Sequence, residues 1–137
     1  MEINFIAFGI GVSLGVNFLL LYTRKHKWSN DFLRWLITVT LLLIGLLGIF
    51  GFLNDLNKDF TIFSWCLTTP FIYNCVDRIF KKISQMCYDR DFYLWLDGSS
   101  EVDESIFGKN THLNIWDKVF SMVLLFLILF LPLIGLI

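Results

Sequence analysis

The side chains best suited to redox or metal chemistry are three cysteines and two histidines, and their spacing predicts neither. Cys66, Cys75 and Cys87 are odd in number and form no C-x-x-C pair, so we expect no disulfide framework. His26 and His112 have no second histidine four residues away and no cysteine close by. Zinc sites in proteins are built from such clusters, so we predict no metal site and no cofactor.

Carboxylates gather in one run, at Asp97, Glu101, Asp103 and Glu104. The run lacks the alternating carboxylates and the glycine of a calcium loop. A solvated helix face, or a docking patch for a basic partner, explains it better. The sequence also shows no nucleophile constellation and no phosphate-binding or dinucleotide-binding loop. We therefore expect a protein that is not an enzyme, and its net charge of −1 predicts no nucleic-acid partner.

Polar side chains inside apolar runs are the remaining candidates for chemistry. Hydroxyls and an amide on one side of a helix bundle can solvate ions or water, which predicts a pore. The same groups can instead bond to a neighbouring helix or to their own backbone, and for the hydroxyls this is the commoner role. Both interpretations stay open for the five candidate pore-lining residues, Ser13, Asn17, Thr61, Ser64 and Thr68.

The elements that carry these side chains are apolar runs long enough to be membrane-spanning helices. Of the 137 residues, 56% are hydrophobic, above the 45–50% or so of soluble domains. At about 1.5 Å per residue, each run covers most of a bilayer core of about 30 Å. We predict an all-α polytopic membrane protein, a single domain over residues 1–137, with spans at 3–22, 32–53, 60–76 and 119–137.

Basic residues indicate how these spans cross. With four spans and the N-terminus outside, ten Lys and Arg side chains lie inside and only Lys58 lies outside. If the short, polar run at 60–76 did not cross, the split would be four inside against seven outside. The positive-inside rule therefore favours four spans with both termini outside, and we expect a bacterial inner membrane.

Small residues indicate how the spans pack. Ala7, Gly11 and Gly15 recur every four residues on one face of the first span, and Gly9, Ser13 and Asn17 recur on roughly the opposite face. We call these two small-residue faces the thin faces of the span. We expect this span to be central, with one thin face packed within the chain and the other against a second copy in a homo-oligomer. The second span carries a glycine edge, which we expect to pack on the first span: Gly45, Gly48 and Gly51.

The inner segment, residues 77–118, is predicted to be a cytoplasmic helical cap. An apolar stripe continues the third helix past the membrane, and Asn114 with Asp117 opens the last helix as a capping box does. Aromatic and basic side chains in this segment either anchor it in the membrane interface or contact a partner protein or small ligand. The residues concerned are Arg78, Lys81, Lys82, Tyr88, Phe92 and Trp95.

These patterns favour two functions. The first is an oligomeric pore or membrane-perturbing effector that is gated by the cap. The second is a non-enzymatic membrane binding protein, such as an immunity protein or an assembly subunit, that docks a partner through its cytoplasmic segment. Subunit number separates them, because the pore requires several copies of the chain.

Overall fold

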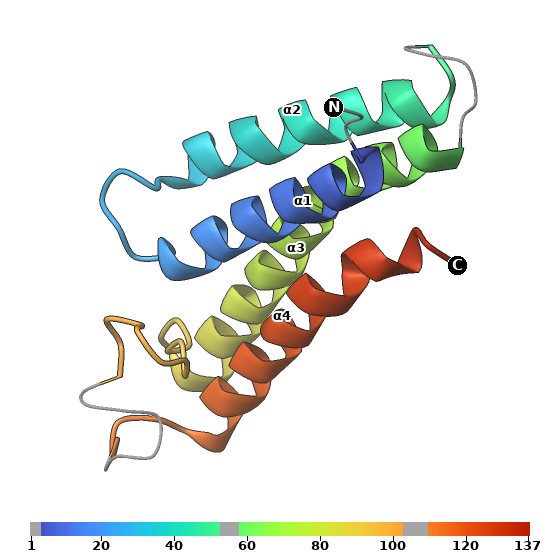
Figure 1. Cartoon of the computed structure of the whole chain (residues 1–137). Coiled ribbons are helices and arrows are strands. Elements are labelled where there is room, and N and C mark those ends of the chain that lie inside the picture. The colour runs from blue at the N-terminus through green and yellow to red at the C-terminus, as the bar shows by residue number, and fades with distance from the viewer. Residues whose placement is uncertain (1–3, 53–57, 103–109) are drawn as a thin grey trace. The chain divides into compact units, whose positions relative to one another are not determined.

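The computed structural model describes residues 4–52, 58–102 and 110–137, and this part of the chain contains helices and no strands (Figure 1). The all-α prediction is confirmed. Residues 3, 53 and 103–109, which the predicted spans and cap include, lie outside the described residues. The four helices are α1 (Phe5–Tyr22), α2 (Asp31–Ile49), α3 (Lys58–Tyr88) and α4 (Ile115–Ile134).

The chain divides into two compact units. Unit 1 comprises Met1–Asn74 and Ile128–Ile137, and unit 2 comprises Cys75–Leu127. Unit 1 therefore holds α1, α2, the first half of α3 and the end of α4, while unit 2 holds the rest of α3 and α4 and the chain between them.

Side-chain caps start the first two helices. The side-chain oxygen of Asn4 accepts a hydrogen bond from the backbone N–H of Ala7 (3.1 Å), and that of Asn30 accepts one from Leu33 (2.8 Å). Each cap satisfies one of the donors that the first turn of a helix leaves unpaired.

A glycine ends α2. Gly51 has φ 75°, its N–H donates to the carbonyl of Gly48, and the next N–H, of Phe52, donates to the carbonyl of Leu47. These two bonds form a Schellman motif with glycine at the left-handed position. Gly51 therefore serves helix termination, which corrects its predicted role in helix packing.

The glycine edge of α2 packs on α3, not on α1 as predicted. A Cβ added at Gly45 would lie 2.6 Å from the carbonyl oxygen of Ser64, and one at Gly48 would meet the Ser64 side chain. Gly9 of α1 likewise faces α3, where an added Cβ would lie 3.0 Å from the Cα of Phe63. The helix at the centre of unit 1 is thus α3, and the prediction that the first span is central is wrong.

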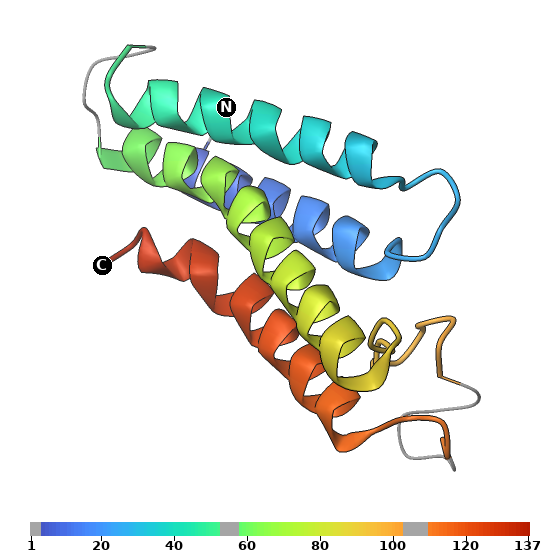
Figure 2. The ribbon, with the colours of Figure 1, turned by 180° about the vertical axis from the view of Figure 1, so that it is seen from behind.

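Within unit 1, contacts with α3 show in which direction α1 and α2 run relative to α3 (Figure 2). Along α1, residues 9 and 13 meet residues 63 and 69 of α3, so the two helices run the same way. Along α2, residues 48 and 38 meet residues 64 and 74, so this helix runs the opposite way. This alternation is what consecutive membrane spans require.

Three of the four helices, α1, α2 and α4, are long and apolar enough to cross a membrane. This finding supports association with a membrane. α3 is not among them. Its apolar positions are interrupted by polar residues, several of which are buried in unit 1: Ser64, Thr68, Thr69 and Asn74.

Unit 2 is only partly helical, which corrects the predicted helical cap. α3 continues to Tyr88, as the apolar stripe predicts, and ends at Asp89, whose φ of 58° is left-handed. The described residues from Asp89 to Val102 form no helix. Four of their amides, those of Tyr93, Leu94, Trp95 and Glu101, donate instead to side chains of α4 or of the loop itself. These side chains replace the carbonyl acceptors that a helix would have supplied.

Candidate functional site

A line of buried polar groups joins α1 to α3 in unit 1. The Ser13 hydroxyl bonds to the Thr69 hydroxyl, and the Asn17 amide lies 3.4 Å from the same oxygen. Thr69 in turn donates to the carbonyl of Cys66 at 2.9 Å. That carbonyl has no helical donor because Pro70, four residues later, lacks an N–H. Thr69 thus satisfies the carbonyl that the proline frees and links α3 to α1.

The five candidate pore-lining residues do not share an open surface in the single chain. Ser13 and Asn17 are fully buried, and Ser64 and Thr68 are 1% and 4% exposed. Ser64 donates to the carbonyl of Phe60, and Thr68 donates to that of Trp65. These four side chains lie between helices, so they stabilise helix contacts in the isolated chain.

Thr61, the fifth candidate, lines an apolar pocket of about 300 Å³. The pocket is formed by α2, α3 and the end of α4, and its other lining residues include Ile49, Trp65 and Gly135. The Trp65 indole donates to the carbonyl of Leu131 at 3.1 Å, and Gly135 lies so close that an added Cβ would meet the ring. Thr61 is therefore separate from the polar line.

The side-chain carbonyl oxygen of Asn17 is a buried acceptor that has no hydrogen-bond partner among the described residues. Its amide nitrogen contacts Ser13 and Thr69, so half of the side chain is satisfied. A buried acceptor without a donor costs free energy, and such groups often mark a functional or hydrated position.

The other small-residue face of α1 is not covered by another helix among the described residues. A Cβ added at Gly11 or Gly15 would have no atom within 4 Å, and Ala7 is exposed. The two thin faces of α1 therefore differ: Gly9, Ser13 and Asn17 pack on α3, whereas Ala7, Gly11 and Gly15 are open.

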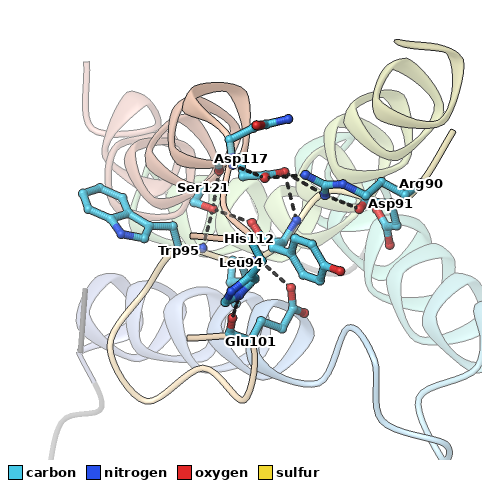
Figure 3. Close-up of polar contacts among 10 residues, drawn as sticks. Arg90, Asp91, Leu94, Trp95, Glu101, His112, Asp117 and Ser121 are labelled. Atoms are coloured by element: carbon cyan, nitrogen blue, oxygen red, sulfur yellow. Dashed lines mark hydrogen bonds and ion pairs between the residues drawn. The ribbon is translucent and has the colours of Figure 1, made fainter. Parts of the chain in front are cut away.

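The strongest polar cluster lies in unit 2, around Asp117 (Figure 3). The Asp117 side chain is 3% exposed and accepts two bonds from the Arg90 guanidinium, at 2.8 and 3.3 Å. It also accepts the backbone N–H of Tyr93 at 3.1 Å and that of Asn114 at 2.8 Å. The hydrogen bond to Asp117 raises the pKa of Arg90 above its ordinary value, so the guanidinium stays charged.

Residues 91–95, here called the docked segment, lie along α4 through further bonds. The N–H of Trp95 donates to the Ser121 hydroxyl at 2.8 Å, and Ser121 donates to the carbonyl of Asp117 at 2.7 Å. The N–H of Leu94 donates to the Glu101 carboxylate at 2.5 Å. Three successive amides of the docked segment are thus satisfied by side chains, and the segment is ordered without a regular secondary structure.

An aromatic cluster fills the inside of unit 2. The rings of Phe80 and Phe120 stack with centroids 4.7 Å apart, and Phe92 meets Phe120 edge to face at 5.4 Å. Phe92 is fully buried, which removes it from the predicted set of interfacial or partner-binding residues. Of that set, Arg78, Lys82 and Tyr88 are exposed, and Lys81 and Trp95 are half-buried.

Two surface contacts complete the site. The Arg90 guanidinium lies over the Tyr93 ring at 4.5 Å, and the Lys118 ammonium lies over the Trp95 ring at 5.1 Å. The sequence indicated Asp117 as a helix cap, and that bond is present. It did not indicate the roles of Arg90 and Ser121. The sequence signal for this cluster was an aspartate and a serine, Asp117 and Ser121, four residues apart on one face of the first turns of α4.

The described residues hold no group of three or more metal-binding side chains. Comparison with known proteins adds no relative: no family model, no curated protein and no solved structure matches the chain.

Proposed function

We propose that this chain is a non-enzymatic integral membrane protein with four spans, and that its unit 2 docks a protein partner, as in an immunity protein or an assembly subunit. In this proposal, residues 77–118, which make up most of unit 2, lie on the cytoplasmic side of a bacterial inner membrane. The two termini lie outside.

Burial supports α3 as a membrane span in addition to α1, α2 and α4. Its polar side chains between Ser64 and Asn74 face other helices, and their hydroxyls donate to carbonyls of the same helix. A span that is covered by protein tolerates polar residues better than one that faces lipid. The alternating directions of α1, α2 and α3 and the ten-to-one distribution of basic residues agree with four crossings.

The observation that carries the docking role is the ordered, non-helical part of unit 2. Its docked segment is fixed by a charged pair, by Ser121 and by a buried aromatic cluster. A loop that only connects two spans needs none of these contacts. A rigid surface, by contrast, loses little conformational entropy on binding, which favours affinity.

Molecular mass and site-specific crosslinking test the proposal. We expect a mass near one chain of 16.1 kDa in detergent, after correction for bound detergent. A photoreactive amino acid at the exposed Ser100 should give one adduct with a different protein in cells, and the same group at exposed Lys27 should not. A mass at a discrete multiple of the chain, with only self-adducts from Ser100, would overturn the docking role.

An oligomeric pore is the second candidate, and two observations favour it. The open face at Ala7, Gly11 and Gly15 suits close packing of a second helix. The unpartnered oxygen of Asn17 suits a hydrated position. Because Asn17 is buried between α1 and α3, conduction along it requires these helices to separate in the assembly.

Flux measurements test the pore. In liposomes, Asn17→Leu should abolish ion flux, and Gly11→Leu should disrupt the oligomer, while both variants still insert. Leu43→Ala is the control, because Leu43 is an exposed residue of α2. Unchanged flux in Asn17→Leu removes the pore from consideration.

A further inference from the structure

The last turns of α3, in unit 2, expose apolar side chains next to cations. Ile79, Ile83 and Met86 are 55%, 41% and 77% exposed and recur at helical spacing on one face. Lys82, which is also exposed, lies within the same turn as Ile79 and Ile83. We call Ile79, Lys82, Ile83 and Met86 the outer stripe. Apolar side chains bordered by lysine are typical of the end of a membrane helix, where the lysine reaches the lipid headgroups.

The stacking of two rings shows which residues of α3 and α4 lie side by side along the two helix axes, here called the same level. α3 and α4 run in opposite directions in both views of unit 2, and Phe80 stacks on Phe120 (Figures 1 and 2). At about 1.5 Å per residue, Lys82 lies at the level of Lys118, and Met86 lies near the start of α4. The outer stripe is therefore level with the turns at which an apolar, span-length helix begins.

Three lysines come to this one level. Lys81 and Lys82 lie on α3, and Lys118 lies on the first turn of α4, where its ammonium contacts the Trp95 ring. Tryptophan and lysine together are characteristic of the headgroup layer of a bilayer.

The backbone amides of the docked segment are paired within the protein, as a position near the headgroup layer requires. Non-helical backbone near a bilayer is tolerated where its polar groups are paired within the protein. The amides of Tyr93 and Trp95 bond to Asp117 and Ser121 of α4, and the amide of Leu94 bonds to Glu101.

We infer that this level of unit 2 is a binding surface for anionic phospholipid headgroups. Lys81, Lys82 and Lys118 contact lipid phosphates, while Ile79, three residues deeper along α3 than Lys82, contacts the upper acyl chains. Ile83 and Met86 lie level with the headgroups and beyond them. The inference rests on the membrane insertion in the proposed function and is independent of a protein partner. The surface, at the end of α3 and the start of α4, prefers anionic lipid to zwitterionic lipid.

Electron paramagnetic resonance of spin-labelled lipid tests the inference. The full chain is reconstituted in phosphatidylcholine vesicles with a trace of spin-labelled phosphatidylglycerol or phosphatidylcholine, and the immobilised fraction is measured. We expect phosphatidylglycerol to be preferred, and Lys82→Gln to lower the preference by up to about fivefold, the effect of about one charge at a membrane surface. Replacement of all three lysines by glutamine should abolish it.

Lys58→Gln is the matched control, because Lys58 is an exposed lysine at the opposite end of α3. It removes one charge and should leave the preference unchanged. Immobilised lipid without any preference for phosphatidylglycerol overturns the inference, as does an equal loss in Lys58→Gln and Lys82→Gln. A complete lack of immobilised lipid overturns membrane insertion itself. Loss of partner crosslinking with an intact lipid preference contradicts only the docking role.

Discussion

The Asp117 carboxylate lies 2.8 Å from the Arg90 guanidinium, and the two residues are 27 positions apart in the chain. Their contact fastens the start of the docked segment to the start of α4. Because the same carboxylate also accepts two backbone N–H groups, it is the point on which the order of unit 2 depends.

The first prediction concerns Asp117→Asn. The amide removes the charge and replaces one acceptor by a donor, so it leaves buried donors unpaired, at a cost of about 1–3 kcal/mol. We expect faster hydrogen–deuterium exchange at the amide of Tyr93 and lower thermal stability. Asp89→Asn is the control, since Asp89 is exposed and asparagine tolerates its left-handed backbone. Equal exchange in both variants would show that the pair is not needed for order.

The second prediction compares glycines in α1 and α2. Gly45→Ala places a methyl group against the Ser64 carbonyl and should destabilise the chain by about 1–3 kcal/mol, as overpacking does. Gly11→Ala meets no atom within 4 Å and should leave the stability of the single chain unchanged or slightly raised. Thermal unfolding in detergent measures both. A loss of stability in Gly11→Ala alone would contradict the packing on α3.

The third prediction concerns the carbonyl freed by Pro70. Thr69→Val removes the hydroxyl that bonds to Cys66 and Ser13 and should cost about 0.5–1.5 kcal/mol. In a Pro70→Ala background the backbone N–H returns, so part of that cost should disappear. Thr40→Val is the control, because the Thr40 hydroxyl donates to the carbonyl of Leu36 in its own helix at an exposed position. Equal costs with and without the proline would show that Thr69 does not serve that carbonyl.

The fourth prediction concerns the end of α2. Gly51→Ala forces a side chain into a left-handed backbone and should lower stability by about 1–2 kcal/mol. Gly51→Asn should cost less, because asparagine enters this region more readily. Chemical denaturation with both variants measures the difference. If the two variants were equally stable, helix packing would explain Gly51 better than termination.

Sequence patterns alone determined the helical class and the presence of long apolar helices. Long apolar runs and the helical period hold wherever the chain folds, so the all-α class, three span-length helices and the extension of α3 to Tyr88 followed from residue order. The capping role of Asp117 followed for the same reason, since a cap involves residues three apart.

Only the tertiary structure decided which faces meet. The sequence showed two thin faces on α1 and a glycine edge on α2, but spacing cannot say which partner each one has. Placing α3 at the centre of unit 1 covers Ser13, Asn17, Ser64 and Thr68, and leaves Gly11 and Gly15 open. The contact of Arg90 with Asp117 was likewise undetermined, because it joins residues distant in the chain whose meeting depends on how α3 and α4 pack.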